Sequence, residues 1–234
     1  MISAAQATGT ETMPVAITIG GERFFADVTG ALWHPGHQAL LVADLHLEKG
    51  SSYARSGQLV PPFDTIATLS RLAAAATRWR ARSIFVLGDA FHDAFAEERI
   101  ADEAVAAIDA LAAGRRLVWI KGNHDPAPPE QVPGDRADEV RLGDLVLRHE
   151  PRKALEGAEI AGHLHPVARV ATRAQVVRRR CFVHDERRLL LPAFGAYAGG
   201  ISVRLPVIAE LFSMPSVHVL GERRVLSIAR DRIV

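Results

Sequence analysis

The first half of the chain alternates short apolar runs with amphipathic stretches. Three runs have the length and the nearly continuous apolar character of strands buried on both faces: Ala39–Ala43, Ser83–Leu87 and Arg116–Ile120. Between them the apolar spacing predicts two helices, one from an N-cap at Asp64 to about Arg80 and one from about Glu97 to Ala113, closed by Gly114. Strands that alternate with helices in this way predict parallel pairing.

Elsewhere the pattern is that of hairpins and short strands. Gly20-Gly21 and Gly143-Asp144 each divide an alternating segment as a hairpin turn does, within residues 14–28 and 139–149. Four further short strands are expected: Glu159–Ala161, Val167–Ala171, Val176–Val183 and Leu189–Leu191. Because no repeat or linker interrupts this order, we expect residues 13–234 to form one α/β domain with a β-rich second half.

The composition is that of an ordinary globular protein. Apolar residues make up 48%, charged residues 24% and aromatic residues 6% of the 234 positions, so the core must be built from Val, Leu, Ile and Ala. The longest apolar runs are too short to cross a bilayer. Residues 1–12 lack the cationic start and the apolar run of a signal peptide, and we interpret them as a disordered extension or as residues upstream of the true start.

Cys181 is the single cysteine of the chain. An intrachain disulfide is therefore excluded, as is a zinc site built on two to four thiolates. We interpret Cys181 as a buried, unreactive thiol and expect a reducing, cytoplasmic compartment.

Charge is distributed unevenly along the chain. Residues 1–149 carry 14 Lys and Arg against 19 Asp and Glu, whereas residues 150–234 carry 14 against 8. A surface for a polyanion explains the basic C-terminal third, and solvated strand edges protected by Arg and Lys explain it equally well. Composition alone leaves both interpretations open.

Polar residues of ligating types follow each of the three apolar runs. The segments at the strand ends are Asp44-Leu45-His46, Gly88-Asp89 and Gly122-Asn123-His124-Asp125. In open α/β sheets, ligands bind in the crevice beyond the carboxyl ends of the strands. The three segments are therefore expected at one edge of the sheet.

Side-chain spacing supports this convergence. Side chains at i and i+2 of an extended segment point to one face, so Asp44 and His46 are expected to converge. His163 and His165 have the same spacing, and His149 ends another strand, at Leu145–Arg148. A lone His or strand-end Asp is usually structural, but five such clusters in one chain predict metal ligation.

The order of these motifs resembles that of the calcineurin-like metallophosphoesterases: D-x-H, G-D, G-N-H-D, a lone H and G-H-x-H. The resemblance implies an α/β sandwich of two mixed β-sheets flanked by helices, and it implies two divalent metal ions. The implied ligands are Asp44, His46 and His165 for one ion, Asn123, His149 and His163 for the other, and Asp89 as a bridge. His124 would lie beside the metals without ligating them.

The set of donor atoms limits the metal independently. Carboxylate, imidazole and amide ligands without thiolate suit manganese, iron or zinc, and we favour manganese. Two such ions beside two carboxylates leave positive charge for a phosphate, and a metal pair about 3.5–4 Å apart can clamp its attacking and leaving oxygens. A protonated His124 would act as the general acid for the leaving alkoxide.

One position departs from many phosphatase members of that family. They carry an Asp three residues after the bridging Asp, where it orients the catalytic His, and this chain has His92 there. A Phe-His pair at this place is similar to the DNA-repair nuclease branch. Three interpretations stay open: Asp93 takes the orienting role, His92 contacts substrate, or His92 is a plain surface residue.

A narrower resemblance covers most of the chain. Four segments are similar to the bacterial ligase-associated DNA-damage-response endonucleases: Leu41–Gly50, Arg148–Pro151, Ala161–Pro166 and Leu191–Tyr197. The resemblance implies manganese-dependent cleavage of phosphodiester bonds in DNA during repair. It also implies functional association with a DNA ligase, an exonuclease and a helicase. No membrane partner is expected.

Residue-level support for DNA is thinner. Lys49 and Arg55 are placed either to reach a substrate phosphate or to lie in a solvated loop. The run Arg178–Arg180 is suited to bind phosphates, or to face water as part of an alternating strand. Four histidines match no motif, and we interpret them as structural or exposed: His34, His37, His184 and His218.

Two other functions compete with a DNA-cleaving enzyme. A phosphatase or phosphodiesterase for small-molecule or nucleotide substrates would have a lidded pocket instead of an open, basic groove. A non-catalytic metal-binding scaffold would be expected to lack ligands, and this chain has all seven.

Overall fold

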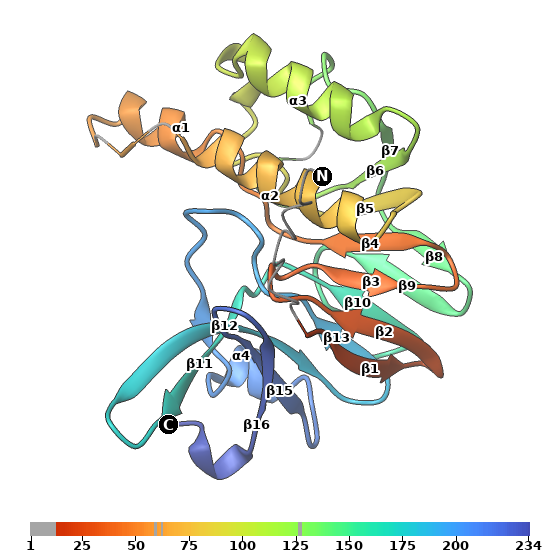
Figure 1. Cartoon of the computed structure of the whole chain (residues 1–234), viewed down its shortest axis with the longest axis vertical. Helices are drawn as coiled ribbons and strands as arrows, with labels where there is room; N and C mark the ends of the chain where they lie inside the picture. The colour runs from red at the N-terminus through yellow and green to blue at the C-terminus, as the bar shows by residue number, and fades with distance from the viewer. Residues whose placement is uncertain (1–12, 59, 62, 126–127) are drawn as a thin grey trace, which may run out of the picture.

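Two mixed β-sheets packed face to face form the centre of the molecule (Figure 1). The computed structural model describes residues 13–58, 60–61, 63–125 and 128–234. The predicted disordered extension, residues 1–12, lies outside the described residues. The expected α/β sandwich of two mixed sheets flanked by helices is confirmed. That residues 13–234 form one domain stays a prediction.

The first sheet has seven strands that lie in sequence order. Strands β1 to β4 pair antiparallel and β4 to β7 pair in parallel, which confirms the parallel pairing expected of the three apolar runs. The strands are β1 (Val15–Ile19), β2 (Glu22–Ala26), β3 (Leu32–His34), β4 (Ala39–Val42), β5 (Ser83–Leu87), β6 (Arg116–Ile120) and β7 (Asp135–Ala137).

The second sheet has nine strands, with the order β14-β11-β12-β13-β10-β9-β8, and β15 pairs with both β12 and β16. Strand β10 is parallel to β9 and to β13, whereas β12 runs antiparallel to both β11 and β15. The strands are β8 (Val140–Leu142), β9 (Leu145–Arg148), β10 (Ala158–Ala161), β11 (Pro166–Ala171), β12 (Val176–His184), β13 (Arg188–Leu190), β14 (Ile201–Ser202), β15 (Ser216–Leu220) and β16 (Val225–Ile228).

The helices correct the expectations in two places. They are α1 (Lys49–Arg55), α2 (Asp64–Arg78), α3 (Asp102–Ala112) and α4 (Pro206–Ala209), with 3₁₀ turns at Ala96–Glu98 and Arg230–Arg232. The second expected helix begins at Asp102, because Ala96–Glu98 forms a separate 3₁₀ turn. Asp64 is not the N-cap of α2 but its first residue, and its carboxylate accepts the backbone N–H groups of Lys49 and Gly50 at the start of α1.

Core packing explains why the apolar runs are continuous. In β4, Leu40 and Val42 face the layer of α2 and α3, while Leu41 and Ala39 face the second sheet. The apolar run of β4 is therefore buried on both faces. Because burial of apolar surface stabilises the fold, such a strand needs apolar side chains at every position. A third cluster, which includes the buried Cys181, lies on the far side of the second sheet. No helix in the described ranges is long and apolar enough to span a membrane.

Candidate metal centre

The candidate ligands lie where the strands of both sheets end. The segments that follow β4 and β5 stay hydrogen-bonded to each other. The Asp44 amide donates to the Gly88 carbonyl at 3.1 Å, and the His46 amide donates to the Asp89 carbonyl at 2.9 Å. Five candidate ligands have a positive φ: Asp44 (56°), His46 (44°), Asp89 (46°), His163 (68°) and His165 (42°).

This backbone conformation corrects the geometry expected from the sequence. Asp44 and His46 do converge, but not as alternate residues of an extended strand, because both are in the left-handed region. Non-glycine residues rarely adopt positive φ, and those that do cluster at functional sites because the surrounding structure must hold them there. The strand ends therefore form sharp, well-supported turns that aim the side chains.

The first cluster combines ligand atoms from four residues within 4.8 Å of one another: Asp44, His46, Asp89 and His165. The Nε2 atoms of His46 and His165 are 3.3 Å apart, and His165 Nε2 is 3.2 Å from an Asp44 carboxylate oxygen. Asp44, His46 and Asp89 are buried and His165 is half-buried.

The second cluster shares Asp89 with the first. Asp89, His149 and His163 offer ligand atoms within 4.8 Å of one another. The Asn123 side-chain oxygen is 2.9 Å from both His149 Nε2 and His163 Nδ1. The structure thus brings all seven predicted ligands together in the two groups that the family resemblance implies, and their role as metal ligands stays a prediction.

The donor atoms of both clusters fit divalent ions. Ligand atoms about 2.0–2.1 Å from one ion lie about 3.0–3.4 Å from each other, which is the spacing of the imidazole nitrogens here. His149 Nε2 and His163 Nδ1 are 3.2 Å apart, as close as the His46–His165 pair. Nitrogen lone pairs that converge in this way repel each other unless a proton or a metal ion lies between them. The clusters contain no thiolate, so the donors suit manganese, iron or zinc.

Hydrogen bonds from outside the clusters orient the donors. His149 Nδ1 donates to the Leu87 carbonyl at 3.0 Å, which leaves Nε2 as the ligating nitrogen. Burial alone would lower the pKa of His149, but the hydrogen bond to Asp89 and the charge of Asp44 raise the pKa to about 9. Burial opposes ionisation of Asp89 as well, yet the hydrogen bond and charge of His149 hold the pKa of that carboxyl below its usual range.

Two glycines allow the strand ends to approach each other. Gly88 has a φ of +74°, and a Cβ there would lie 2.3 Å from the His149 ring. A Cβ at Gly122 would lie 2.2 Å from the backbone nitrogen and a carboxylate oxygen of Asp89. Any side chain at either position would displace a candidate ligand, so only glycine fits.

His124 lies at the exposed side of the clusters. Its backbone N–H donates to an Asp89 carboxylate oxygen at 3.0 Å, and its Nδ1 donates to the His92 carbonyl at 3.2 Å. The His92 ring stacks on the His124 ring with centroids 5.7 Å apart. Asp93 is engaged elsewhere, since both of its carboxylate oxygens accept from Arg99. A backbone carbonyl, and not a carboxylate, therefore orients His124.

The predicted substrate contacts divide into two groups. Lys49 and His92 lie at the centre: the Lys49 charge lowers the pKa values of His46 and His92, in both cases after burial as the main cause. Arg55 pairs instead with Glu98 at 3.1 Å, and both of these side chains are exposed. Residues 49–55 form helix α1, so the alternative of a solvated loop is wrong. Tyr53, which the sequence pattern did not single out, contacts the His92 ring edge-on at 5.6 Å.

The arginine run does not act as one unit. Arg180 is half-buried and donates to the carbonyls of Ala193 and Gly195, so the interpretation that it faces water is wrong. Arg178 and Arg179 are exposed. Arg71 also donates to a carbonyl of this loop, that of Phe194. These half-buried arginines hold the loop that follows β13, and the Gly195 amide of that loop donates to the Asp44 carbonyl at 3.0 Å.

A sandwich of two mixed sheets with two candidate ligand clusters that share a carboxylate is the arrangement that the family resemblance implies, and comparison with known proteins agrees. The chain is similar to the solved structure of the Pseudomonas putida nuclease MPE, with 29% sequence identity and a TM-score of 0.72, covering 92% of this chain and 100% of that chain. A likeness to the phosphoesterase YfcE from E. coli has 16% identity and a TM-score of 0.37 over 84% of this chain and 96% of that chain, too weak to carry an argument. No protein-family model and no curated protein matches the chain. The fold and the order of the candidate ligands resemble those of the calcineurin-like metallophosphoesterase superfamily, and the likeness to the nuclease supports that resemblance.

Proposed function

We propose that the chain is a dinuclear, manganese-dependent phosphodiesterase that cleaves DNA as an endonuclease and acts in DNA repair. The observation that carries the proposal is the pair of ligand clusters that share Asp89, with His124 held beside them by Asp89 and His92. A single-ion site would need only one of these clusters. Two clusters joined by one carboxylate are the arrangement expected of a metal pair.

The chain's own residues would bind and place the ions. Asp44, His46 and His165 would hold one ion, and the remaining ligands would hold the other: Asn123, His149 and His163, with Asp89 shared. When bound, two divalent ions polarise a phosphate ester and lower the pKa of water to about 7, so that a nucleophile is present at neutral pH. Burial of Asp44 and Asp89 keeps bulk water away from the carboxylates that bind the cations.

His124 would serve the leaving group. Its Nδ1 donates to the His92 carbonyl, which leaves Nε2 available to a substrate oxygen. An imidazolium at this place can pass a proton from Nε2 to the departing alkoxide, and the His92 ring stacked on it restricts its rotation. The side chains of Asn123 and His124 are exposed, so a substrate can reach them from the surface.

Two observations favour DNA over a small substrate. The similar solved structure is that of a nuclease, and Asn123 and His124 are exposed at the surface of the clusters. The hollow beside His163 is about 440 Å³ in volume, and its charged lining residues are Glu150, Lys153 and Glu210, so its charge does not add to the argument for DNA. Functional association with a DNA ligase, an exonuclease and a helicase is part of the proposal and rests on the segment resemblance alone. A cytoplasmic location is also part of the proposal and rests on the single cysteine of the chain.

The test is hydrolysis of bis-p-nitrophenyl phosphate and nicking of circular single-stranded DNA, both with Mn²⁺. Wild type is compared with Asp89→Ala, which removes the shared ligand, and with the control Asp144→Ala in the exposed β8–β9 turn. We expect wild type and the control to cleave both substrates and Asp89→Ala to cleave neither. Cleavage of the small diester without nicking would overturn the DNA assignment, and activity of Asp89→Ala would overturn the shared centre.

The phosphatase alternative has its own readout. A phosphatase would prefer p-nitrophenyl phosphate to the diester, so the ratio of kcat/KM for the two substrates decides between the activities. We expect the diester to be preferred. No hydrolysis of either substrate with manganese, iron or zinc would favour the non-catalytic scaffold.

A further inference from the structure

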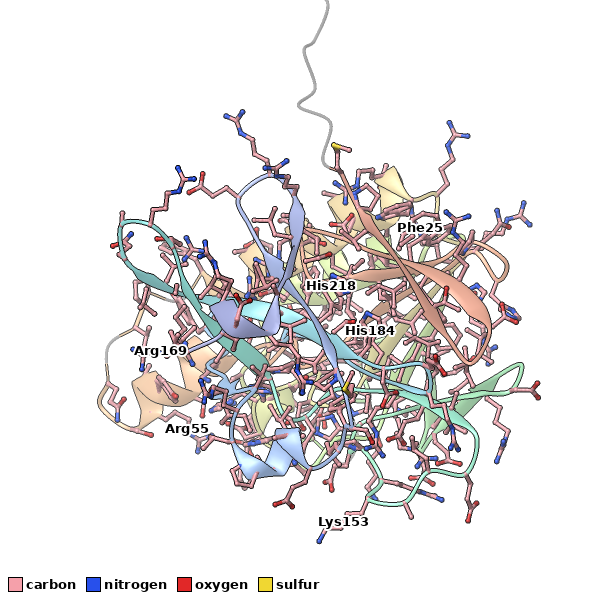
Figure 2. All side chains as sticks on the ribbon, turned by 90° about the horizontal axis from the view of Figure 1, so that it is seen from below. Phe25, Arg55, Lys153, Arg169, His184 and His218 are labelled. Atoms are coloured by element: carbon pink, nitrogen blue, oxygen red, sulfur yellow. The ribbon has the colours of Figure 1, made fainter. Side chains whose placement is uncertain are left out.

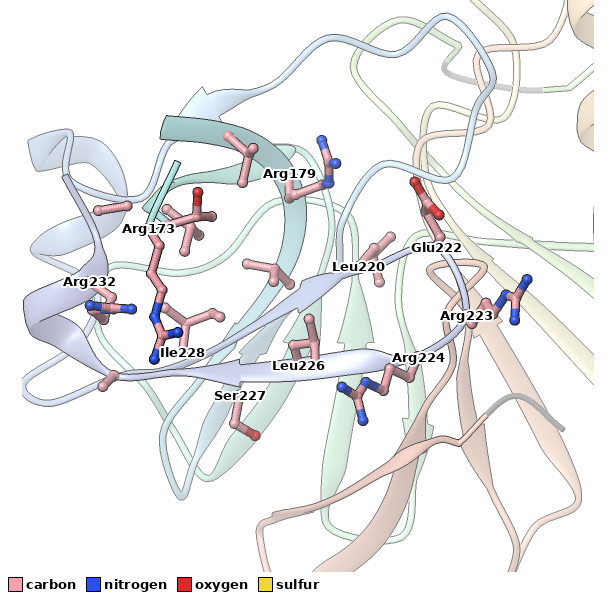
Figure 3. A pocket seen from close by; sticks show the side chains of 17 residues that line it. Arg173, Arg179, Leu220, Glu222, Arg223, Arg224, Leu226, Ser227, Ile228 and Arg232 are labelled. Atoms are coloured by element: carbon pink, nitrogen blue, oxygen red, sulfur yellow. The ribbon is translucent and has the colours of Figure 1, made fainter. Parts of the chain in front are cut away.

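A groove rich in arginine lies on the second sheet, apart from the ligand clusters (Figure 3). It has a volume of about 810 Å³, and the hairpins β11–β12 and β15–β16 form its walls. Its floor is apolar, with side chains such as Val177, Leu220 and Ile228. Five arginines line it, and we call it the arginine groove: Arg173, Arg179, Arg223, Arg224 and Arg232.

The positive charge of the groove is not neutralised by the protein. All five arginines are exposed, and among the described residues none forms an ion pair with a carboxylate, although Glu222 is also in the lining. Arg178 lies between the groove residues Val177 and Arg179, so its side chain projects from the other face of β12. Arg169 lies directly opposite Arg178 in the β11–β12 register and is labelled in Figure 2. This pair is therefore not part of the groove.

A second hollow adjoins the arginine groove. It has a volume of about 360 Å³, shares Arg179, Leu220 and Glu222 with the groove, and continues to the loop at Ala198–Gly199. Strand β14 follows this loop, and its Ile201 amide donates to the backbone carbonyl of the candidate ligand His165 at 3.1 Å. The loop beside the groove is therefore close in sequence to a segment that is hydrogen-bonded to a candidate ligand.

We propose that the arginine groove binds the sugar-phosphate backbone of a nucleic-acid strand, outside the part of the strand that is cleaved. This inference rests on the proposed function and deepens it. Guanidinium groups bind phosphate oxygens with two parallel hydrogen bonds, and arginines spaced along a groove match a repeating anion. None of the residues that line the groove in the described chain is aromatic, so the bases are not stacked and binding does not depend on sequence.

The experiment measures binding without cleavage. A labelled single-stranded oligonucleotide of mixed sequence is titrated with the full chain in EDTA, by fluorescence anisotropy, from 50 to 200 mM salt. The groove variant carries three substitutions from different walls: Arg173→Ala, Arg224→Ala and Arg232→Ala. We expect affinity to fall at least about tenfold and the slope of log K against log salt to become shallower by about 2, since each lost phosphate contact removes about 0.7.

The control variant removes the same charge elsewhere. Arg80, Arg82 and Arg141 are exposed, lie away from the carboxyl ends of the strands, and are each changed to Ala. If the control weakens binding as much as the groove variant, only net charge matters and the proposal is overturned. Thermal unfolding of both variants shows whether they are folded. A groove variant with Lys at the three positions is expected to keep most of the salt dependence if positive charge at the groove is the cause.

Three further outcomes would overturn the inference. If wild type nicks circular DNA with Mn²⁺ but the groove variant binds the oligonucleotide like wild type, the groove inference fails and the proposed function stands. If wild type neither binds nor nicks DNA, the proposed function fails and this inference with it. Tighter binding of poly-glutamate than of an oligonucleotide of the same charge would assign the groove to an acidic polypeptide and overturn the nucleic-acid partner.

Discussion

His124 is held from two directions without belonging to either ligand cluster. Its backbone is fixed by Asp89 and its ring by the carbonyl of His92. A carbonyl accepts a hydrogen bond from both the neutral and the protonated ring, so this contact fixes orientation in either protonation state. Because the contact is to backbone, removal of the His92 side chain would leave it intact.

The first prediction concerns the role of His124 as a general acid. We expect His124→Ala to keep its bound manganese and to lose about 10²–10⁴-fold in DNA cleavage, because the alkoxide leaving group needs a proton. The loss is expected to be much smaller for bis-p-nitrophenyl phosphate, since p-nitrophenolate leaves without protonation. The measurement is kcat on both substrates, with the exposed His37→Ala as control. Equal losses on the two substrates would contradict the acid role.

The residue scale also shows what the sequence could not predict. The residue types and order of the ligands were sufficient to predict which side chains converge. The positive φ values of Asp44, Asp89 and His163 were not predictable. Asp and His adopt a left-handed conformation more often than most non-glycine residues, but still rarely, and tertiary contacts decide where they do so.

At the scale of elements, the turn after each strand decides the geometry of the centre. Gly88 and Gly114 have nearly the same φ, +74° and +71°, but different surroundings. A Cβ at Gly88 would lie 2.3 Å from the His149 ring, whereas a Cβ at Gly114 would meet nothing within 4 Å. A side chain at Gly114 would therefore add only the strain of a positive φ, whereas a side chain at Gly88 would also displace a candidate ligand.

The second prediction uses this pair. Gly114→Ala is expected to cost about 1–2 kcal/mol of unfolding free energy and to leave manganese affinity unchanged. Gly88→Ala is expected to cost more and to weaken manganese binding by about 10–100-fold, the usual effect of disturbing the support of a metal ligand. Urea unfolding and calorimetric Mn²⁺ titration measure the two quantities. Manganese affinity that falls equally in both variants would show that His149 is not the cause.

Helix α1 shows where local sequence fails to predict an element. Its sequence, Lys49–Arg55, contains Gly and two Ser and has low helix propensity. A residue of α2 stabilises the first turn of α1, because the Asp64 carboxylate accepts hydrogen bonds from two free N–H groups at the start of α1. Asp64 was predicted as the cap of its own helix, and a sequence pattern cannot show that it caps a neighbour in space.

At the scale of the molecule, both sheets contribute candidate ligands to the centre. Asp44, Asp89 and Asn123 follow strands of the first sheet, whereas His149 and His163 follow strands of the second. The sequence predicted these strands well because each is a continuous apolar run that ends in polar residues. It did not predict β3, β7, β14, β15 and β16. Strands β3, β7 and β14 have only two or three residues, and β15 and β16 pair with β12 and with each other near the C-terminus.

The third prediction concerns stability and pH, from a histidine pair away from the metal centre. His184 and His218 stack on neighbouring strands, with their Nε2 atoms 2.8 Å apart (Figure 2). Burial first, and then the charge of His184, lowers the pKa of His218 to about 4. The unfolded chain takes up this proton near pH 6.5, so the pair's contribution is full above about pH 6.5 and is lost as pH falls toward 4.

The measurement is the free energy of unfolding in urea at several pH values between about 7.5 and 4.5, with a chelator present. We expect wild type to lose about 1–3 kcal/mol more than His218→Gln across this range, because Gln cannot take up the proton. Carboxylates contribute equally to both proteins and cancel in the difference. Parallel pH profiles for the two proteins would contradict the assignment.

The central claim is a pair of metal ions that share Asp89, and the number of manganese ions bound per chain tests it most directly. Equilibrium dialysis with elemental analysis gives the number, and electron paramagnetic resonance shows whether neighbouring ions are coupled. The account predicts two coupled Mn²⁺ ions in wild type and in the control Asp144→Asn, and loss of the coupled pair in Asp89→Asn. One ion per wild-type chain, two uncoupled ions, or a coupled pair that survives in Asp89→Asn would contradict it.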